Sequence, residues 1–87
     1  MPEISVSIDP DDNEILSIYI RLSENHVTET LQLGPKCNLD LDRRKNVVGA
    51  EILAPCDLNI IYRIADQYHA PLLKRIAPHA ERLCQVA

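Results

Sequence analysis

The spacing of the apolar residues changes once along this chain of 87 residues, and that change limits the fold more than any other feature. Up to Leu53, apolar residues alternate with polar ones, as Ile4, Val6 and Ile8 do with the serines between them. After Pro55, apolar residues recur instead at intervals of three and four. The first spacing is typical of half-buried strands and the second of amphipathic helices. Strands followed by helices predict an α+β protein.

Five alternating runs predict the strands. The runs are separated by turn formers such as Asp9–Asn13 and Gly34 with Pro35, because Pro presets a turn and Asp and Asn side chains bond nearby amides. The short connections favour antiparallel pairing between strands that follow one another in the sequence. We therefore expect an antiparallel β-meander of four to five strands, drawn from Ile4–Ile8, Ile15–Leu22, Val27–Leu33, Cys37–Asp42 and Val47–Leu53.

Two C-terminal helices are predicted to pack on one face of this sheet. Asp57 is the expected N-cap of the first helix, which runs to about residue 68 or 69. Its apolar residues cover an arc of roughly 200°, which is wider than one contact surface needs. The second helix is expected from about Pro71 to about Gln85. Its apolar phase continues across Pro78, which favours one helix, bent near the proline, over two separate segments.

The length predicts a single domain over residues 1–87, with the meander in 1–54 and the two-helix layer in 57–86. A domain of this size buries only about 60–65% of the surface that its unfolded chain exposes. The chain has no Trp and no Phe, so Ile, Leu and Val must form the core. Self-association would therefore add to the stability of the fold.

The charge distribution argues against nucleic acid as a partner. Residues 1–56 hold ten acids and five bases, a net charge of −5, and residues 57–87 hold three acids and four bases, a net charge of +1. The total of −4 gives no overall attraction for phosphates. The basic turn Arg43–Lys45 is short and fits a solvated hairpin tip.

The expected location is the cytoplasm. The three cysteines are widely spaced, which is typical of reduced thiols rather than of a disulfide framework. The N-terminal residues lack the pattern of a signal peptide, and no apolar run approaches the ~18 residues of a membrane span. We expect a soluble protein with no membrane partner.

Two sequence blocks resemble a known signature. The stronger block reads Asn-Leu-Asp-Leu-Asp at 38–42, then a polar turn, then Val-Val-Gly-Ala-Glu-Ile-Leu at 47–53. The weaker block pairs Asp9 and Pro10 with Tyr19 and Ile20. Together they resemble the YuzE-like family of small uncharacterised proteins, over roughly residues 4–53. The chain departs from the family pattern in a longer spacing before Tyr19 and in lacking a glycine between 42 and 47.

The resemblance implies a meander fold with no established activity. Members of that family sometimes stand beside small toxin-like genes, which implies an antitoxin-like role. The resemblance brings no functional residues with it, and it does not extend to the predicted helices.

One acidic stretch begins like a calcium loop. Asp9, Asp11 and Asn13 have the spacing of the first ligands in such a loop. The sixth and twelfth positions, which should be Gly and Glu, are Glu14 and Ile20. A solvated hairpin turn is therefore the favoured interpretation.

Four further acids lie within the predicted strands. Asp40 and Asp42 share one side of a strand, which two-carboxylate chemistry could use, but the solvent face of an edge strand is the favoured interpretation. Glu29 and Glu51 occupy otherwise apolar rows. The favoured interpretation of these two is partial exposure, or pairing with a base such as Arg21 on a neighbouring strand.

No metal, cofactor or catalytic residue is expected from the sequence. Zinc ligands are usually paired two to four residues apart. The closest candidates here, His79 and Cys84, are five apart on a helix and point about 140° away from each other. No His is placed beside a Cys in a way that indicates a nucleophile. The cysteines and histidines considered are Cys37, Cys56, Cys84, His26, His69 and His79.

The favoured interpretation is that the protein is a non-enzymatic protein-interaction module that acts as a homodimer or with a small protein partner. A narrower version of this interpretation is an antitoxin-like role. The alternative is a small ligand-binding protein or enzyme that uses the acidic face of the meander, although no small-molecule ligand is evident. The wide apolar arc of the first helix places the expected interaction surface on the helices. Its residues are Ile60, Ile64, Tyr68, Leu72, Ile76 and Leu83.

Overall fold

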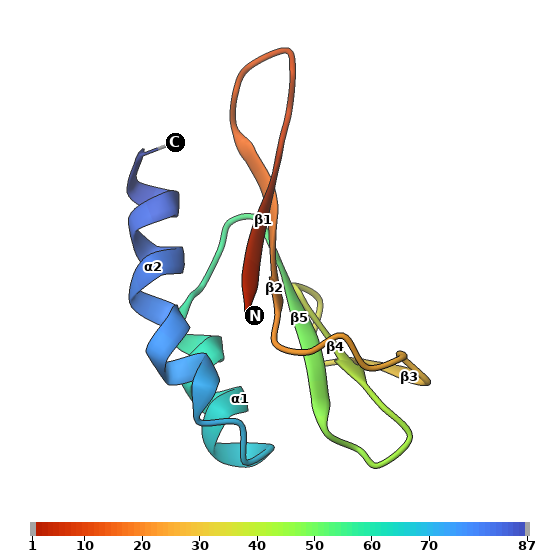
Figure 1. Cartoon of the computed structure of the whole chain (residues 1–87). Helices are drawn as coiled ribbons and strands as arrows, with labels where there is room; N and C mark the ends of the chain where they lie inside the picture. Colours follow the sequence, from red (N-terminus) through yellow and green to blue (C-terminus); the bar gives the residue numbers. More distant parts are fainter. Residues whose placement is uncertain (1, 87) are drawn as a thin grey trace.

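The computed structural model describes residues 2–86, with side chains described through Cys84, and has five strands followed by two helices (Figure 1). The predicted α+β fold, an antiparallel sheet with two C-terminal helices on one of its faces, is confirmed. The elements are β1 (Glu3–Ile8), β2 (Ile15–Arg21), β3 (Glu29–Gln32), β4 (Cys37–Leu41), β5 (Val47–Leu53), α1 (Asn59–Gln67) and α2 (Leu72–Val86).

The strand order is β1-β2-β5-β4-β3, and every neighbouring pair is antiparallel. The expected pairing of sequence neighbours holds for β1–β2, β3–β4 and β4–β5, but it is wrong for β2–β3, because β5 lies between them. β2 pairs with β5 rather than with β3 because β5 has the longer row of apolar side chains facing the core. Ile18 and Ile20 of β2 lie opposite Ile52 and Ala50, whereas the short β3 offers only Leu31 in its inward row.

Both helices lie on the same side of the sheet, and the core fills the space between the two layers (Figure 1). Burying each large aliphatic side chain stabilises the fold by about 1.5–3 kcal/mol. The largest side chains that are less than 2% exposed come from β2, β4, β5, α1 and α2; they include Ile18, Ile20, Leu39, Ile52, Ile61, Ile64 and Leu73.

Helix α1 begins one residue later than predicted. Leu58, not Asp57, is the N-cap, and the Asp57 carboxylate instead accepts a hydrogen bond from the Asn59 N–H at 3.1 Å. The helix ends as expected near residue 68. His69 has a positive φ of 53°, and the next N–H, that of Ala70, bonds the carbonyl of Ala65 at 2.9 Å. This pattern is a Schellman motif.

Helix α2 runs without interruption through Pro78, so the prediction of a single helix is confirmed. Pro71 precedes it, and the Pro71 carbonyl accepts a hydrogen bond from the Lys74 N–H at 3.0 Å. Pro78 lies on the exposed side, while Ala77 and Ala80 are buried. The proline therefore leaves the packing face of the helix intact.

The outer part of the β1–β2 hairpin, residues 8–16, extends beyond the rest of the molecule and is called the hairpin arm here (Figure 1). It accounts for the long axis of the molecule, whose dimensions are 39 × 25 × 22 Å. At its tip, Asp9 Oδ1 accepts a hydrogen bond from the Asp11 N–H, and Asp12 Oδ1 accepts one from the Glu14 N–H. The favoured interpretation of this stretch as a hairpin turn is confirmed.

Candidate functional site

A hydrogen-bonded cluster lies on the helix-free face of the sheet. The Tyr19 hydroxyl of β2 donates to Asp40 Oδ2 of β4 at 2.7 Å, and the Thr30 hydroxyl of β3 donates to Asp40 Oδ1 at 2.6 Å. Both carboxylate oxygens of Asp40 are therefore engaged by side chains from two different strands. We call these three residues the Tyr19–Asp40 network.

Gly49 lets the tyrosine reach its partner. Gly49 lies on β5, between the two strands, directly opposite both Asp40 and Arg21. A Cβ atom at this position would lie 2.2 Å from the Tyr19 hydroxyl oxygen and 2.6 Å from its Cζ. The ring of Tyr19 thus crosses β5 through space that any larger residue would fill.

Tyr19 holds its proton strongly in this setting. Burial, and then the hydrogen bond to Asp40 and the charge of that carboxylate, raise the pKa of Tyr19 to about 12. The Arg21 guanidinium lies 5.7 Å from the centre of the Tyr19 ring and opposes this shift. At neutral pH the phenol is therefore a hydrogen-bond donor and a poor proton-transfer group.

Glu51 also lies on this face, beside the Tyr19–Asp40 network. Its Oε1 accepts a hydrogen bond from the Asn38 amide at 3.0 Å, so its partner is not the Arg21 suggested by the sequence. The β4–β5 register shifts between Asp40 and Leu41, which pairs Leu41 with Val47 and places Val47 in the core. Val47 and Glu51 therefore do not share the row that the alternation predicted.

Asp42 has a structural role at the β4–β5 turn. Its side chain accepts hydrogen bonds from the N–H groups of Arg44 and Asn46 at 2.8 and 3.0 Å and from the Asn25 amide at 3.0 Å. These bonds, that from the Asn46 N–H first, lower the pKa of the Asp42 carboxyl below its ordinary value. The residue is only 6% exposed.

The four strand acids do not converge on one site. Asp40 and Glu51 lie on the helix-free face, Asp42 closes a turn, and Glu29 forms an ion pair with Lys45. Among the described residues, every buried side-chain nitrogen and oxygen has a hydrogen-bond partner. The Tyr19–Asp40 network is thus internally satisfied, and it ties three strands together rather than presenting free groups to a ligand.

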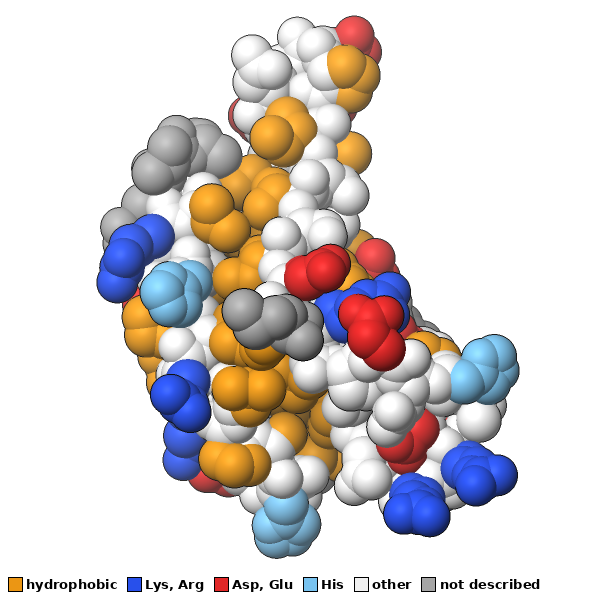
Figure 2. All heavy atoms as spheres, viewed as in Figure 1, with side chains coloured by type: hydrophobic (Ala, Val, Ile, Leu, Met, Phe, Trp, Pro, Cys, Tyr) orange, Lys and Arg blue, Asp and Glu red, His pale blue; other side chains and the backbone are white. Residues whose placement is uncertain are grey.

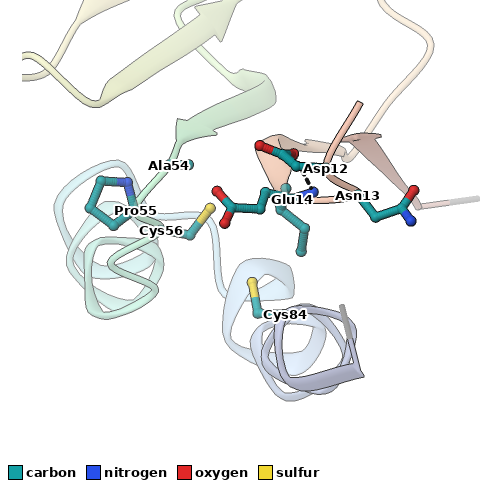
Figure 3. Close-up of a pocket in the computed structure, with 8 residues that line it drawn as sticks. Asp12, Asn13, Glu14, Ala54, Pro55, Cys56 and Cys84 are labelled. Atoms are coloured by element: carbon teal, nitrogen blue, oxygen red, sulfur yellow. Dashed lines mark hydrogen bonds between the residues drawn. The ribbon is translucent and has the colours of Figure 1, made fainter. Parts of the chain in front are cut away.

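A hollow of about 840 Å³ lies at the end of the molecule that carries the hairpin arm (Figure 3). It is bounded by the tip of the arm, the β5–α1 connection and the last turns of α2. Nothing in the sequence indicated it, because its walls come from three distant segments. Its lining residues are Asp12, Asn13, Glu14, Ile15, Ala54, Pro55, Cys56 and Cys84.

The predicted interaction surface on the helices is only partly exposed. Ile64 and Ile76 are 1% and 7% exposed and belong to the core, so their assignment to a surface is wrong. The wide apolar arc of α1 is explained by packing against both the sheet and α2. Ile60, Tyr68 and Leu72 are half-buried against the core.

Three large hydrophobic side chains are exposed among the described residues: Ile8 at 49%, Leu16 at 50% and Leu83 at 41%. Ile8 and Leu16 are the first and last residues of the hairpin arm, and the last turns of α2, which carry Leu83, lie at the same end of the molecule (Figure 1). Figure 2 shows apolar side chains in a band between the helices and the sheet that continues toward the arm. We call Ile8, Leu16 and Leu83 the exposed apolar set.

Within residues 2–86, no three His, Cys, Asp or Glu side chains are grouped so that they could hold a metal ion. None of the helices in the same range combines the length and the apolar character needed to cross a membrane.

The fold and the network describe a small α+β protein whose five-stranded sheet carries helices on one face and a polar, hydrogen-bonded cluster on the other. A family model described as "Protein of unknown function (DUF2283)" matches residues 5–54, which is more than half of the chain. The chain belongs to this family of uncharacterised proteins. A search of curated proteins and a search of solved structures each found no match.

The matched segment covers nearly all of the sheet and none of α1 or α2. It includes Tyr19, Asp40, Gly49 and Glu51, the residues of the helix-free face that also carry the sequence resemblance. The family match therefore includes the sheet and its polar face. It includes Ile8 and Leu16 of the exposed apolar set but not Leu83, which lies on α2.

Proposed function

We propose that this protein is a non-enzymatic interaction module that associates with a second copy of itself through the hairpin arm and the outer side of α2. The observation that carries the proposal is the position of the exposed apolar set, with all three residues at one end of the molecule. Exposed apolar side chains favour association, because burying them in an interface stabilises the complex by about 25 cal/mol for each Å² of apolar surface.

Charge complementarity favours a second copy as the partner. The tip of the arm carries four acids, Asp9, Asp11, Asp12 and Glu14, and we call them the acidic tip. On α2, Arg75 and Arg82 are exposed, are seven residues apart, and so share one side of the helix. Neither arginine forms an ion pair with another residue in the described part of the chain.

In a dimer with two-fold symmetry, both copies would make the same charge and apolar contacts. In such an interface, the same surface patch is used by each subunit, and residue i of one copy meets residue j of the other. The acidic tip of each copy would lie against the arginines of its partner, and the exposed apolar set would be buried between them. Because the arm projects from the body, it can make these contacts without any change in the fold.

A charge-swap experiment tests this arrangement. One variant carries Asp11→Lys and Glu14→Lys, and a second carries Arg75→Glu and Arg82→Glu. The first variant leaves the tip with no net charge and the second brings like charges together, so each alone loses the attraction at both contacts and should dissociate. An equimolar mixture regains it at one contact, between the unmodified tip of one variant and the unmodified arginines of the other, and should form the mixed dimer, measured by native mass spectrometry. The variant with Arg43→Glu and Arg44→Glu makes two matched changes at the β4–β5 turn, away from the arm, and should remain dimeric.

The results separate the possible partners. Dissociation of each variant together with restoration in the mixture would support the proposal. If the charge variants behave as the unmodified protein does, or if the mixture fails to pair, the arm and α2 do not form the interface. A monomer that binds only a different protein would also overturn the proposal.

Two narrower hypotheses belong to this proposal. One identifies the family more closely as YuzE-like and gives the protein an antitoxin-like role in the cytoplasm, supported by the resemblance over residues 4–53 and by the free cysteines. It predicts that expression of the chain restores growth to cells arrested by a small toxin-like protein of the kind found beside members of that family, and continued arrest would contradict it. The other treats residues 1–87 as one domain, which predicts a single cooperative unfolding transition.

A further inference from the structure

Two cysteines that are far apart in the sequence meet at the arm end of the molecule. Cys56 lies in the connection between β5 and α1, and Cys84 lies in the last turns of α2. Both line the 840 Å³ hollow, and both also line an adjoining hollow of about 340 Å³. Figure 3 shows the two side chains entering the larger hollow from different elements.

Both thiols are free and half-buried, in contrast to Cys37, which is 1% exposed inside the core. Burial raises the pKa of the Cys56 thiol, and the neighbouring Cys84 thiol raises it further. The two side chains line the same two hollows, so both thiols face a common space. Because both hollows are open to solvent and neither side chain is fully buried, the pair is accessible to a small reagent.

Carboxylates surround the pair. Asp12 and Glu14 line the larger hollow, and Asp57 and Glu81 line the smaller one. No Lys, Arg or His lines either hollow in the described part of the chain. The field around the sulfurs is negative, so it attracts cationic reagents and repels anionic ones.

We propose that Cys56 and Cys84 form a dithiol site that exchanges with small cationic disulfides and closes to a reversible disulfide. One thiolate attacks a sulfur of the reagent disulfide, forms a mixed disulfide and releases one reagent thiol. The second thiolate then attacks the protein sulfur and releases the other reagent thiol. In balance, one reagent disulfide is reduced to two thiols, and the two cysteine thiols lose two protons and two electrons to become one disulfide.

Closure would join α2 to the β5–α1 connection. The new covalent bond spans the chain from residue 56 to residue 84 and so encloses all of α1. Cross-linking a segment of this length restricts the unfolded chain. The oxidised protein should consequently unfold at a temperature about 10 °C higher than the reduced protein. Closure of the disulfide does not depend on self-association, whereas the preference for cationic reagents is that of the monomer, because Asp12 and Glu14 also belong to the acidic tip.

The test uses the full chain with cystamine as a cationic disulfide and oxidised glutathione as an anionic one. With cystamine, the intact mass should fall by two hydrogens without an adduct, and titratable thiols in denaturant should fall from three to one. Dithiothreitol should restore all three. The rate with oxidised glutathione should be at least about ten-fold lower, because the acidic surroundings repel it.

Three variants locate the reaction. Cys56→Ser and Cys84→Ser should each stop at the mixed disulfide and retain a cystamine adduct, while the matched Cys37→Ser variant should close as the unmodified protein does. A stable cystamine adduct on the unmodified protein, or peptide mapping that finds Cys37 in the disulfide, would overturn the proposed pair. An equal or faster rate with oxidised glutathione would overturn the proposed substrate class.

Discussion

Tyr19 donates a hydrogen bond of 2.7 Å to Asp40 across a strand to which neither residue belongs. The bond links β2 to β4 over the top of β5, and β5 can be crossed because Gly49 has no side chain. Three residues from distant parts of the chain therefore depend on one another for their geometry. This relationship explains why a tyrosine, a glycine and an aspartate belong together on the helix-free face.

Replacing Gly49 by alanine should destabilise the protein by about 1–3 kcal/mol, as overpacking does. The new Cβ would lie 2.2 Å from the Tyr19 hydroxyl oxygen and 2.9 Å from the Ile20 carbonyl oxygen. Urea denaturation measures the change. In a Tyr19→Ala background the same replacement should cost less, because the ring is gone. An equal cost in both backgrounds would show that the ring does not occupy the space above Gly49.

The ionisation of Tyr19 should report its bond to Asp40. In a variant with Tyr62→Phe and Tyr68→Phe, ultraviolet absorbance follows only Tyr19, and its pKa should be about 12 rather than 10.0. Asp40→Asn removes the negative charge and should lower this pKa. A titration near 10 in the parent variant, or no change on Asp40→Asn, would contradict the network.

The same shift has a consequence for stability. The folded-state pKa of Tyr19 lies above its ordinary value, so the folded state favours the protonated phenol. The raised pKa of Tyr19 therefore adds to the free energy of unfolding. This contribution is complete below about pH 10 and is lost as the pH rises toward about 12. Denaturation of the parent variant at several alkaline pH values should show this loss, and a Tyr19→Phe version should lack it.

Asp42 should stabilise the protein only while it is ionised. Its folded-state pKa lies below the ordinary 3.8, so its contribution is present above about pH 4 and is lost as the pH falls through the lower folded value. Stability measured between neutral and acidic pH should fall less steeply in Asp42→Asn. NMR titration of the carboxyl carbon gives the pKa directly, and a value above 3.8 would contradict the assigned hydrogen bonds.

Two isoleucines of α1 should differ sharply in their contribution to the core. Ile64→Ala should destabilise the protein by about 2–5 kcal/mol, because it removes a side chain that is only 1% exposed. The matched Ile60→Ala change should cost less, since Ile60 is half-buried at the edge of the core. Equal losses would mean that the two positions are packed alike.

The sequence predicted most of the fold because local periodicity determines strands and helices. It located all five strands, the end of α1 and the passage of α2 through Pro78. It did not predict that β5 inserts between β2 and β4, since the choice of partner depends on which distant apolar rows match. The shift of Val47 into the core depends on the same pairing and could not be read from alternation alone.

The candidate sites were less predictable, for a related reason. Asp40 was placed on a solvent face and Glu51 in a partly exposed apolar row, but their partners Tyr19 and Asn38 become neighbours only through the strand order. Ile64 was placed on the surface because a wide apolar arc does not show which layers will cover it. The residues that form the arm end come from three segments, and sequence spacing carries no signal that brings those segments together.

The most direct test of self-association is the mass of the unmodified protein by sedimentation equilibrium. The proposal predicts a mass near twice 9.8 kDa at protein concentrations of about 100 µM. Leu16→Asp, which changes the most exposed member of the exposed apolar set, should return the mass to that of the monomer, and Gln32→Glu, on the edge strand β3, should leave the dimer intact. A mass of 9.8 kDa for the unmodified protein at that concentration would contradict the proposal.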